Sequence, residues 1–303
     1  MVPLFDLHCD TLSTLFKFNF NFENLLTHIS LEKSKAFQPY IQIGAIWSDF
    51  RQSNEEAFDS YKQNIQYIKQ QNIALSTYPS MLESPTFILS VEDARLLNGH
   101  IDRLERLFND GVRVLTLNWR GISCIGGGWD TDIGLTKLGY DVIRECIKMG
   151  IIIDLSHSSV TVQNQAFKLC ENLGAKPIFS HSNSFSVCNH RRNLEDIAFK
   201  RILSLGGIVG ISLCPEHLNN GKNAAINDII KHIEHYISLG GENSTCLGCD
   251  FDGVSSLPLG INSIGDLTIL FSELSKSFSK EIAEKIFFNN AYNFFIKNLT
   301  KGA

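Results

Sequence analysis

Eight short apolar segments, separated by longer stretches, constrain the fold of this sequence more than any other feature. They are rich in β-branched or aromatic residues and are followed by polar residues, as strands are. The run Ile151-Ile152-Ile153 is apolar at every position, which is typical of strands covered on both faces of a parallel sheet. We therefore predict strands at Leu4–His8, Ile41–Trp47, Thr86–Ser90, Val112–Leu117, Ile151–Leu155, Pro177–Ser180, Ile208–Leu213 and Thr245–Cys249.

Helical patterns lie between many of these segments. Asp93–Asn109 and Leu138–Met149 carry apolar residues three or four positions apart, and glycine follows each within two residues. Asn193 is a residue type that often caps a helix start, so we expect a helix from there through Leu205. Two closing helices are predicted at Ile264–Phe278 and Lys280–Phe295.

Eight strands alternating with helices over 303 residues predict an α/β fold, a (β/α)₈ barrel forming one domain over residues 1–303. A doubly wound sheet is the alternative. Its first strand-to-helix turn would carry a glycine-rich dinucleotide fingerprint, whereas this chain has His8-Cys9-Asp10 there. Residues Asp10–Pro39 have no clean period and are the least predictable part.

The composition indicates which classes of binding partner and which cellular compartment to expect. With 27 Lys and Arg against 32 Asp and Glu, the chain has a net charge of −5, which argues against nucleic acid as a partner. No apolar run approaches the roughly 20 residues of a membrane span, and no secretory signal precedes the first strand. The eight cysteines are scattered, so reduced thiols and a cytoplasmic location are expected. Cys246 and Cys249 form a C-x-x-C that no second pair completes, and we interpret both as core thiols.

Ionisable residues recur where the predicted strands end, the position at which barrel enzymes carry their chemistry. On an extended backbone, residues two apart share a face, so His8 and Asp10 should point together and Cys9 away. Five of the eight strands end in such residues: His8 with Asp10, Glu92, His157, His181 and Asp250.

This set predicts a metal centre. Three neighbouring carboxylates would repel one another unless cations lay among them, and imidazole with carboxylate suits Zn²⁺. Five ligands exceed one four-coordinate site with room for water, so two ions are expected, with Glu92 bridging them by position. Alone, His157 or His181 would more often be a core histidine, and Asp252 is an alternative to Asp250 as the acid at the rim.

Several segments carry a resemblance to the renal (membrane) dipeptidase family, in order from about residue 5 to residue 255. The opening motif, the fourth-, fifth- and sixth-strand segments and the eighth-strand segment are similar to those of the family. They are His8-Cys9-Asp10-Thr11-Leu12, Gly111–Leu117, Ile153-Asp154-Leu155-Ser156-His157, Phe179-Ser180-His181-Ser182 with Arg191-Arg192-Asn193, and Gly248-Cys249-Asp250-Phe251-Asp252-Gly253-Val254.

The resemblance implies a zinc-dependent (β/α)₈ barrel, related to the amidohydrolases, that cleaves dipeptides. It implies two divalent ions per chain, with Zn²⁺ as the preferred metal. Imidazole and carboxylate ligands also accept Mn²⁺ or Co²⁺. By this resemblance Asp250 lies beside the bridging water and Arg192 meets the substrate carboxylate. The ion ligands that it implies are His8 and Asp10 for one ion, His157 and His181 for the other, and Glu92 as the bridge.

These roles are chemically coherent. Two cations would lower the pKa of a shared water, and the resulting metal-bridged hydroxide could attack an amide while Asp250 carries its proton to the leaving amine. Arginine offers a bidentate fork to a free carboxylate, although Arg191 or Arg192 could instead pair with an acid such as Glu195.

Two positions depart from the family pattern. Trp119 stands where the best-studied members have a histidine after the fourth strand, and tryptophan cannot ionise. The exit of the seventh strand, Leu213–His217, lacks an expected tyrosine, and the chain is shorter than the mammalian-type members and lacks their secretory and anchoring ends. These departures concern the substrate more than the metal.

The sequence thus favours a dipeptidase acting on a small dipeptide, and a homodimer is compatible with it. One alternative is a related binuclear hydrolase acting on another amide, a lactam or a lactone. The other is a non-catalytic metal-binding barrel, which the presence of all five ligand residues and Asp250 disfavours.

Overall fold

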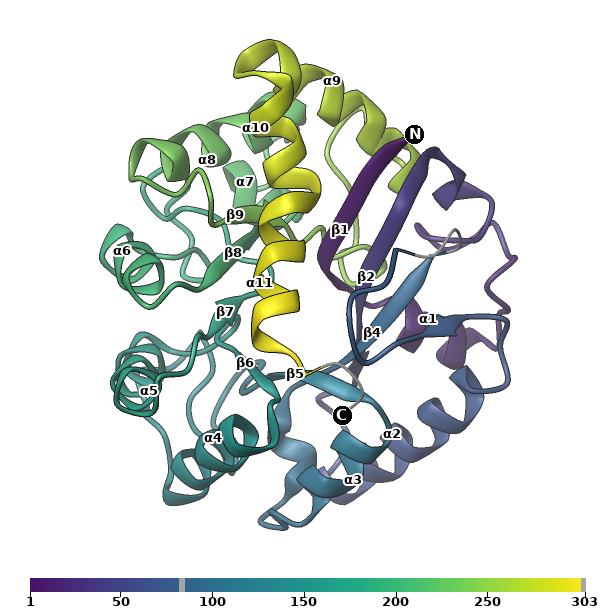
Figure 1. Cartoon of the computed structure of the whole chain (residues 1–303). Helices are drawn as coiled ribbons and strands as arrows, with labels where there is room; N and C mark the ends of the chain where they lie inside the picture. The colour runs from purple at the N-terminus through teal and green to yellow at the C-terminus, as the bar shows by residue number, and fades with distance from the viewer. Residues whose placement is uncertain (82–84, 301–303) are drawn as a thin grey trace.

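The computed structural model describes residues 1–81 and 85–300, which form a closed barrel of parallel strands surrounded by helices (Figure 1). The strands are β1 (Val2–Cys9), β2 (Phe37–Trp47), β3 (Ala74–Leu75), β4 (Thr86–Glu92), β5 (Val112–Thr116), β6 (Ile152–Asp154), β7 (Ile178–Phe179), β8 (Ile208–Ile211) and β9 (Thr245–Leu247). Every strand except β3 belongs to the ring, which closes where β2 pairs with β4 and β1 with β9. The short β3 pairs only with the first two residues of β4. All eight predicted strands, and the barrel, are confirmed.

Helices follow most of the strands and form the outer layer (Figure 1). They are α1 (Thr11–Phe18), α2 (Asn54–Ile68), α3 (Arg103–Asn109), α4 (Lys137–Met149), α5 (Val160–Leu173), α6 (Asp196–Ser204), α7 (Pro215–Asn219), α8 (Ile226–Ser238), α9 (Leu267–Ser277), α10 (Lys280–Glu284) and α11 (Asn290–Asn298). Short 3₁₀ turns occupy Lys33–Ala36, Ala94–Leu97 and Ile264–Asp266, and a π-helical segment at Lys285–Asn289 joins α10 to α11.

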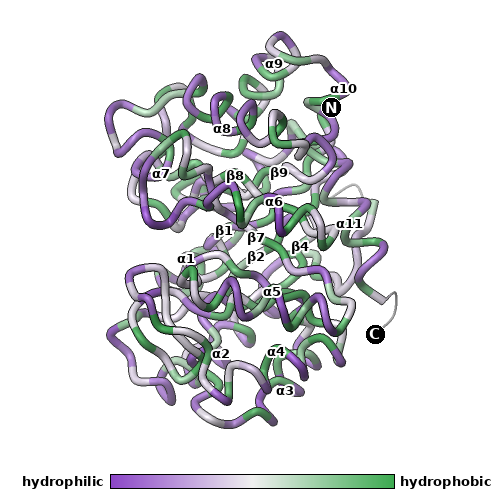
Figure 2. Tube along the Cα trace, turned by 90° about the vertical axis from the view of Figure 1, so that its left-hand side faces the viewer, coloured by the Kyte–Doolittle hydropathy of each residue, from purple (hydrophilic) through white to green (hydrophobic). Residues whose placement is uncertain are grey.

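Apolar side chains fill the barrel from the amino-terminal part of its strands. Those of the π-helical segment, α11 and Leu299 pack beneath them, with the rings of Phe5 and Phe295 5.0 Å apart. Seen from the side in Figure 2, α11 lies at one end of the barrel, while α1 and α7 lie at the other. The strand residues of this cluster are Phe5, Leu7, Ile41, Ile43, Ile88, Val114, Ile152, Ile178, Ile208 and Cys246.

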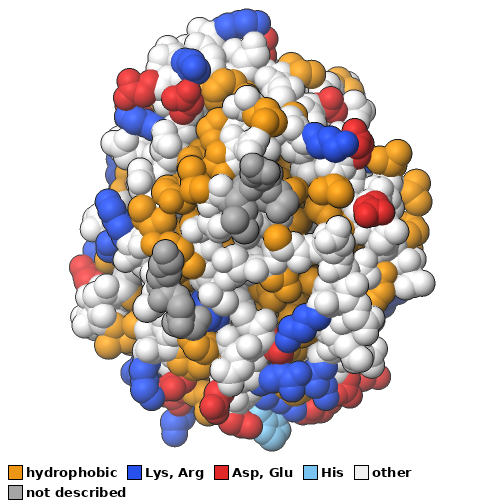
Figure 3. Space-filling model, turned by 45° about the vertical axis from the view of Figure 1, so that its right-hand side comes forward, with side chains coloured by type: hydrophobic (Ala, Val, Ile, Leu, Met, Phe, Trp, Pro, Cys, Tyr) orange, Lys and Arg blue, Asp and Glu red, His pale blue; other side chains and the backbone are white. Residues whose placement is uncertain are grey.

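The outer faces of the strands pack against the surrounding helices. Ile152 belongs to the interior cluster, whereas its neighbours Ile151 and Ile153 belong to the outer one. A strand that alternates between two apolar layers needs apolar residues at every position, which explains the run in the sequence. On the face shown in Figure 3, apolar side chains collect in the middle and charged ones around the edge.

The prediction of one helix over Asp93–Asn109 was wrong. The chain makes a 3₁₀ turn, then breaks at Asn98 (φ 44°) and Gly99 (φ 85°) before α3 begins. Two consecutive left-handed residues end a helix, and asparagine followed by glycine tolerates this conformation best.

Asn193 does not cap the next helix, because α6 begins three residues later, after Glu195. The Asn193 side chain instead donates hydrogen bonds of 2.8 Å to the carbonyls of Cys188 and His217, which hold two loops together. The irregular stretch Asp10–Pro39 contains α1, which the sequence did not reveal because it is only eight residues long.

The remaining expectations concern the termini and the cysteines. The predicted closing helices are present, but the first begins with a 3₁₀ turn and the second contains the π-helical segment. The cysteines are free, and Cys246 and Cys249 are buried as expected. Within the part of the chain that the structure describes, no helix has the length and apolarity needed to cross a bilayer.

Candidate metal centre and active site

The six side chains predicted at the strand ends meet at the carboxyl end of the barrel, opposite α11. Glu92 is the last residue of β4, and the others lie at the end of β1 or within four residues after β6, β7 or β9. His8 and Asp10 point together while Cys9 packs into the outer core, as predicted. The side chains that the structure brings together are His8, Asp10, Glu92, His157, His181 and Asp250.

Glu92 lies between two groups of ligand atoms. Its Oε2 is 3.6 Å from His8 Nε2. Its Oε1 is 2.9 Å from His157 Nε2 and 3.6 Å from His181 Nε2. One carboxylate therefore presents a separate oxygen to each side of the centre.

The first side contains two further carboxylates. His8 Nε2 is 3.7 Å from Asp10 Oδ2 and 3.8 Å from Asp250 Oδ1. Gly253 makes room for them, because a Cβ there would lie 2.2 Å from both carboxylate oxygens. The sequence analysis gave no role to Gly253, although its place directly after Asp250-Phe251-Asp252 was a signal.

The second side consists of two imidazoles. His157 Nε2 and His181 Nε2 are 2.8 Å apart, and the His181 ring stacks on that of His8 with centroids 3.9 Å apart. His157 has φ 65°, a conformation uncommon outside glycine and asparagine, and such strain often marks a functional position.

Burial sets the protonation of the carboxylates. It raises the pKa of Asp10 to about 6, with the charge of Glu92 adding to the effect. It raises the pKa of Asp250 well above the ordinary value, against the opposing charge of His8. For Glu92, burial is outweighed by the charge of His8 and by hydrogen bonding to His157, so its pKa lies below the usual value.

The pKa values of the three histidines shift in different directions, although all three are in the same buried centre. Burial lowers the pKa of His157 to about 4 and that of His181 well below its usual value. For His8, burial is outweighed by the charges of Glu92 and Asp10, so its pKa is raised. A protonated His8 therefore supplies positive charge to carboxylates that burial disfavours.

The donor atoms fit divalent cations. His8 Nε2 and Asp10 Oδ1 are buried, and neither has a hydrogen-bond partner in the described structure. Buried polar atoms rarely remain without partners, and a cation would satisfy both. Two clusters have donor atoms close enough to hold an ion: His8 with Glu92 and His181, and His8 with Asp10 and Asp250. Imidazole nitrogen and carboxylate oxygen together suit Zn²⁺, Mn²⁺ or Co²⁺.

Asp252, the alternative to Asp250, points away from this centre. Its carboxylate accepts hydrogen bonds from the Thr11 hydroxyl (2.6 Å) and the His28 backbone (2.7 Å). It therefore ties the loop after β9 to the segments after β1.

Arg192 is buried beside the centre and makes no ion pair with Glu195. It donates to the carbonyl of His181 at 3.3 Å, and its Nε has no hydrogen-bond partner among residues 1–81 and 85–300. Burial lowers its pKa, and the charges of Asp250 and Glu92 oppose the effect. Arg191, in contrast, is exposed and pairs with Asp132 at 3.0 Å.

Aromatic side chains border the second side. The ring of Trp119 lies 5.4 Å from Trp47, 5.6 Å from Phe50 and 6.2 Å from His157, between centroids. The Trp47 and Phe50 contacts were not predicted, because they join the end of β2 and the loop after it to the loop after β5, which is distant in sequence. His217, at the exit of β8, lies among further rings, 4.7 Å from His190.

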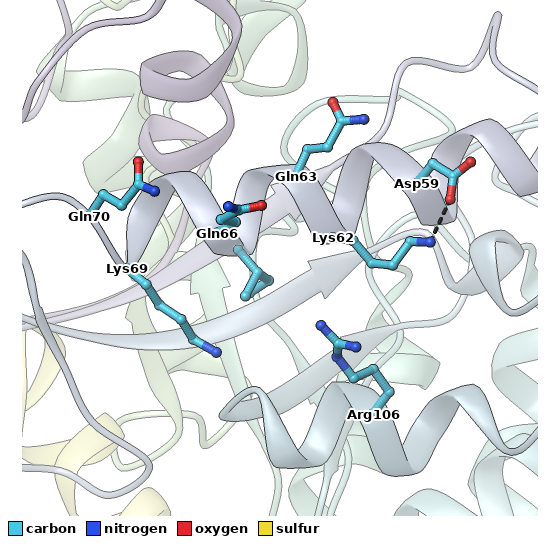
Figure 4. A pocket seen from close by; sticks show the side chains of 8 residues that line it. Asp59, Lys62, Gln63, Gln66, Lys69, Gln70 and Arg106 are labelled. Atoms are coloured by element: carbon cyan, nitrogen blue, oxygen red, sulfur yellow. Dashed lines mark ion pairs between the residues drawn. The ribbon is translucent and has the colours of Figure 1, made fainter.

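A hollow of about 640 Å³ lies between α2 and α3 (Figure 4), and none of the six side chains of the centre lines it. Its cations are paired: Lys62 with Asp59 at 2.6 Å, and Lys69 and Arg106 with Asp110 at 3.0 and 2.7 Å. It therefore resembles an ordinary charged surface rather than a site.

Fold and site together define a class: (β/α)₈ barrel proteins with a histidine and carboxylate centre at the carboxyl ends of the strands. Residues 1–296 match the family model "Membrane dipeptidase (Peptidase family M19)". The chain belongs to this family.

Individual proteins similar to this chain carry dipeptidase or metallopeptidase names, in agreement with the family assignment. The chain is 31% identical to "Dipeptidase aclJ" of Aspergillus oryzae over 196 residues, 62% of this chain and 45% of that protein, so the match spans less than half of the relative. A family M19 metallopeptidase called dipeptidase AC has a similar fold (TM-score 0.88, 22% identity, 98% and 99% of the two chains). So does a metallopeptidase from Rhodobacter sphaeroides liganded with a phosphinate mimic of L-Ala-D-Ala (TM-score 0.89, 21% identity, 99% of each chain).

Proposed function

We propose that this chain is a binuclear, zinc-dependent dipeptidase that requires a free carboxylate on its substrate. The observation that carries the proposal is the position of Glu92, whose two oxygens face His8 on one side and His157 with His181 on the other. Membership of family M19 supports the dipeptidase activity.

In this proposal His8 and Asp10 would hold one ion, His157 and His181 would hold the other, and Glu92 would contribute an oxygen to each. When bound, two such ions would polarise an amide carbonyl and lower the pKa of a water at the centre. The chain itself supplies buried nitrogen and oxygen donors at the carboxyl end of the barrel.

Asp250 is the proposed proton carrier. Its Oδ1 lies 3.8 Å from His8 Nε2, and burial raises its pKa, which favours holding a proton. It would accept the proton of the attacking water and pass it to the leaving amine nitrogen.

Arg192 is the proposed carboxylate ligand. Its guanidinium is buried, lacks a paired carboxylate among the described residues and has an unpartnered Nε, so donors are free for a substrate. A fork of this kind would select substrates with a free carboxyl terminus.

The alternative is a related hydrolase that opens another amide, a lactam or a lactone. Trp119 is the observation that supports this alternative. It stands where the family often has histidine, and its indole N–H is the only polar group that it offers. The two functions differ in whether a free carboxylate is needed.

The test compares Xaa-D-Ala and Xaa-Gly dipeptides with their C-terminal amides. Arg192→Ala should lower kcat/KM for the acids about ten- to hundredfold, because a charge-assisted bidentate contact is lost. The amides should change little, and lysine at this position should restore only part of the activity. The matched control is Arg191→Ala, which removes the adjacent exposed arginine and should leave both substrates unaffected. An equal loss on acids and amides would contradict the assignment.

The cytoplasmic location and the homodimer remain predictions. Cell fractionation tests the first, and light scattering of the purified chain tests the second.

A further inference from the structure

A buried chain of hydrogen bonds connects Asp154 to the ring of His181. Asp154 is the last residue of β6, and Ser180 and His181 directly follow β7, which pairs with β6. Ser180 Oγ lies 2.6 Å from Asp154 Oδ2 and 2.7 Å from His181 Nδ1. The other nitrogen of this imidazole faces Glu92.

The surroundings of Asp154 fix the direction of the first bond. Its Oδ1 accepts the backbone N–H groups of Ser156 (3.0 Å) and Ser180 (2.9 Å). Its Oδ2 lies 2.6 Å from the hydroxyls of Thr116 and Ser180. A carboxylate only accepts hydrogen bonds, so both hydroxyls must donate to it.

The first bond then fixes the second. A serine hydroxyl has one hydrogen, and Ser180 gives it to Asp154, so its oxygen can only accept from His181 Nδ1. His181 must therefore carry its proton on Nδ1, which leaves a lone pair on Nε2. Ser156 fits this scheme, because its Oγ accepts the backbone N–H of His181 and lies 3.3 Å from Ser180 Oγ, to which it can donate.

We propose that Asp154 and Ser180 are positioning residues that hold His181 as the Nδ1–H tautomer, with the Nε2 lone pair directed at the metal centre. The tautomer is a property of the metal-free chain, whereas its use for binding a cation rests on the proposed function. His157 provides the contrast, since its Nδ1 has no hydrogen-bond partner within the described residues. Its tautomer is free to change when a cation binds.

The packing around Ser180 supports a fixed position. A Cβ on Gly210 would lie 2.0 Å from the Ser180 carbonyl oxygen, and one on Gly248 would lie 1.7 Å from it. Gly210 on β8 and Gly248 directly after β9 therefore let the backbone of Ser180 approach closely.

Asp154→Asn tests the direction of the chain with almost no change of shape. Its Oδ1 can still accept the two backbone N–H groups, but the amide nitrogen then replaces Oδ2 and donates to Ser180. The Ser180 hydroxyl is released to donate to His181 Nδ1, and the imidazole proton moves to Nε2. Nitrogen-15 NMR of the imidazoles in the metal-free protein distinguishes the two tautomers.

The expected result is an Nδ1–H signal for His181 in the unchanged protein and an Nε2–H signal in Asp154→Asn. Ser156→Ala, the matched control, removes a neighbouring hydroxyl whose hydrogen bonds go to Ser180 and to the His181 backbone rather than to the ring, and should keep the Nδ1–H form. Ser180→Ala, which has little reason to misfold, should give a mixture of tautomers. An Nε2–H form in the unchanged protein, or the same tautomer in all variants, would overturn the proposal.

The second readout is Zn²⁺ affinity, measured by competition with a chelator. Altering a partner of a metal-ligating histidine costs about ten- to hundredfold in affinity, so Asp154→Asn and Ser180→Ala should each weaken one of two bound ions by that factor. Ser156→Ala should not. Equal weakening in all three variants would contradict the positioning role. If the unchanged chain shows the predicted tautomer but binds no Zn²⁺, the proposed function fails and the tautomer assignment stands.

Discussion

The two ends of the barrel bury different kinds of side chain. At the amino-terminal end, isoleucine, phenylalanine and valine side chains meet the apolar face of α11. At the carboxyl end, the same strands finish in histidines and carboxylates that are also buried. The first arrangement stabilises the fold through apolar burial, whereas the second places charges where burial disfavours them.

The carboxyl end of the barrel also contains strained backbone. Four residues that follow strands at the carboxyl end have positive φ without being glycine: Asp93, His157, Asp250 and Asp252. Strained, desolvated groups persist only when the surrounding structure holds them in place, and here the apolar end provides the stability. The comparison therefore predicts that substitutions at one end change activity and metal content, while those at the other change stability.

The largest effect is expected for Glu92→Gln, which keeps the shape of the side chain and removes its charge. Loss of a carboxylate shared by both sides should release metal and lower kcat/KM at least about a thousandfold. Elemental analysis checks the loss of metal and steady-state kinetics check the loss of activity, on a variant that thermal unfolding shows to be folded. A folded variant that keeps its metal would show that the carboxyl end does not hold metal through Glu92.

Phe295→Ala should produce the opposite result. Its ring is fully buried against Phe5, and removing such a ring costs about 3–5 kcal/mol of stability. Below the melting temperature, kcat/KM and metal content should be unchanged, since α11 is remote from the centre. The control is Asn293→Ala on the exposed side of the same helix, which should leave stability unaltered. Chemical denaturation measures the difference, and a loss of metal in Phe295→Ala would refute the separation.

The pH dependence of stability offers a smaller effect with a defined sign. Burial raises the pKa of Asp250 above that of the unfolded chain. Between the two pKa values the unfolded chain has lost this proton and the folded chain keeps it, so rising pH lowers the free energy of unfolding. We compare the free energy of unfolding of metal-free Asp250→Asn with that of the metal-free unchanged chain. The difference in favour of the variant should be larger at about pH 8 than at about pH 4.

Asp196 supplies the control for that measurement. Despite partial burial, hydrogen bonds from His235 and Ser186 lower its pKa, so its carboxylate stabilises the fold once ionised. Asp196→Asn should thus lose more stability at the higher pH. The prediction is wrong if both variants respond to pH in the same direction.

The two ends also differ in how far the sequence predicts them. Buried parallel strands need apolar residues throughout, so runs such as Ile151-Ile152-Ile153 reveal the barrel directly. The residues at the strand ends could be predicted too, because parallel strands bring their carboxyl ends to one edge. The break at Asn98 and Gly99 was missed because local left-handed geometry overrides an apolar helical pattern.

The supporting contacts could not be derived from one sequence. Asp154 is a lone carboxylate within an apolar run, but its partner Ser180 directly follows the next strand, and the bond depends on how the two strands align. Gly253 matters because it has no Cβ, and the contact of Trp119 with Trp47 depends on the length and shape of the loop after β5. Such features depend on register and loop shape, which residue patterns do not determine.

The central claim is that the carboxyl end of this barrel holds two divalent ions that share Glu92. The most direct measurement is the metal content of the folded chain after reconstitution with Zn²⁺ or Co²⁺, combined with anomalous diffraction to locate the ions. The account predicts two ions per chain, one beside His8 and Asp10 and one beside His157 and His181, with Glu92 between them. A folded chain that binds one ion or none would contradict it.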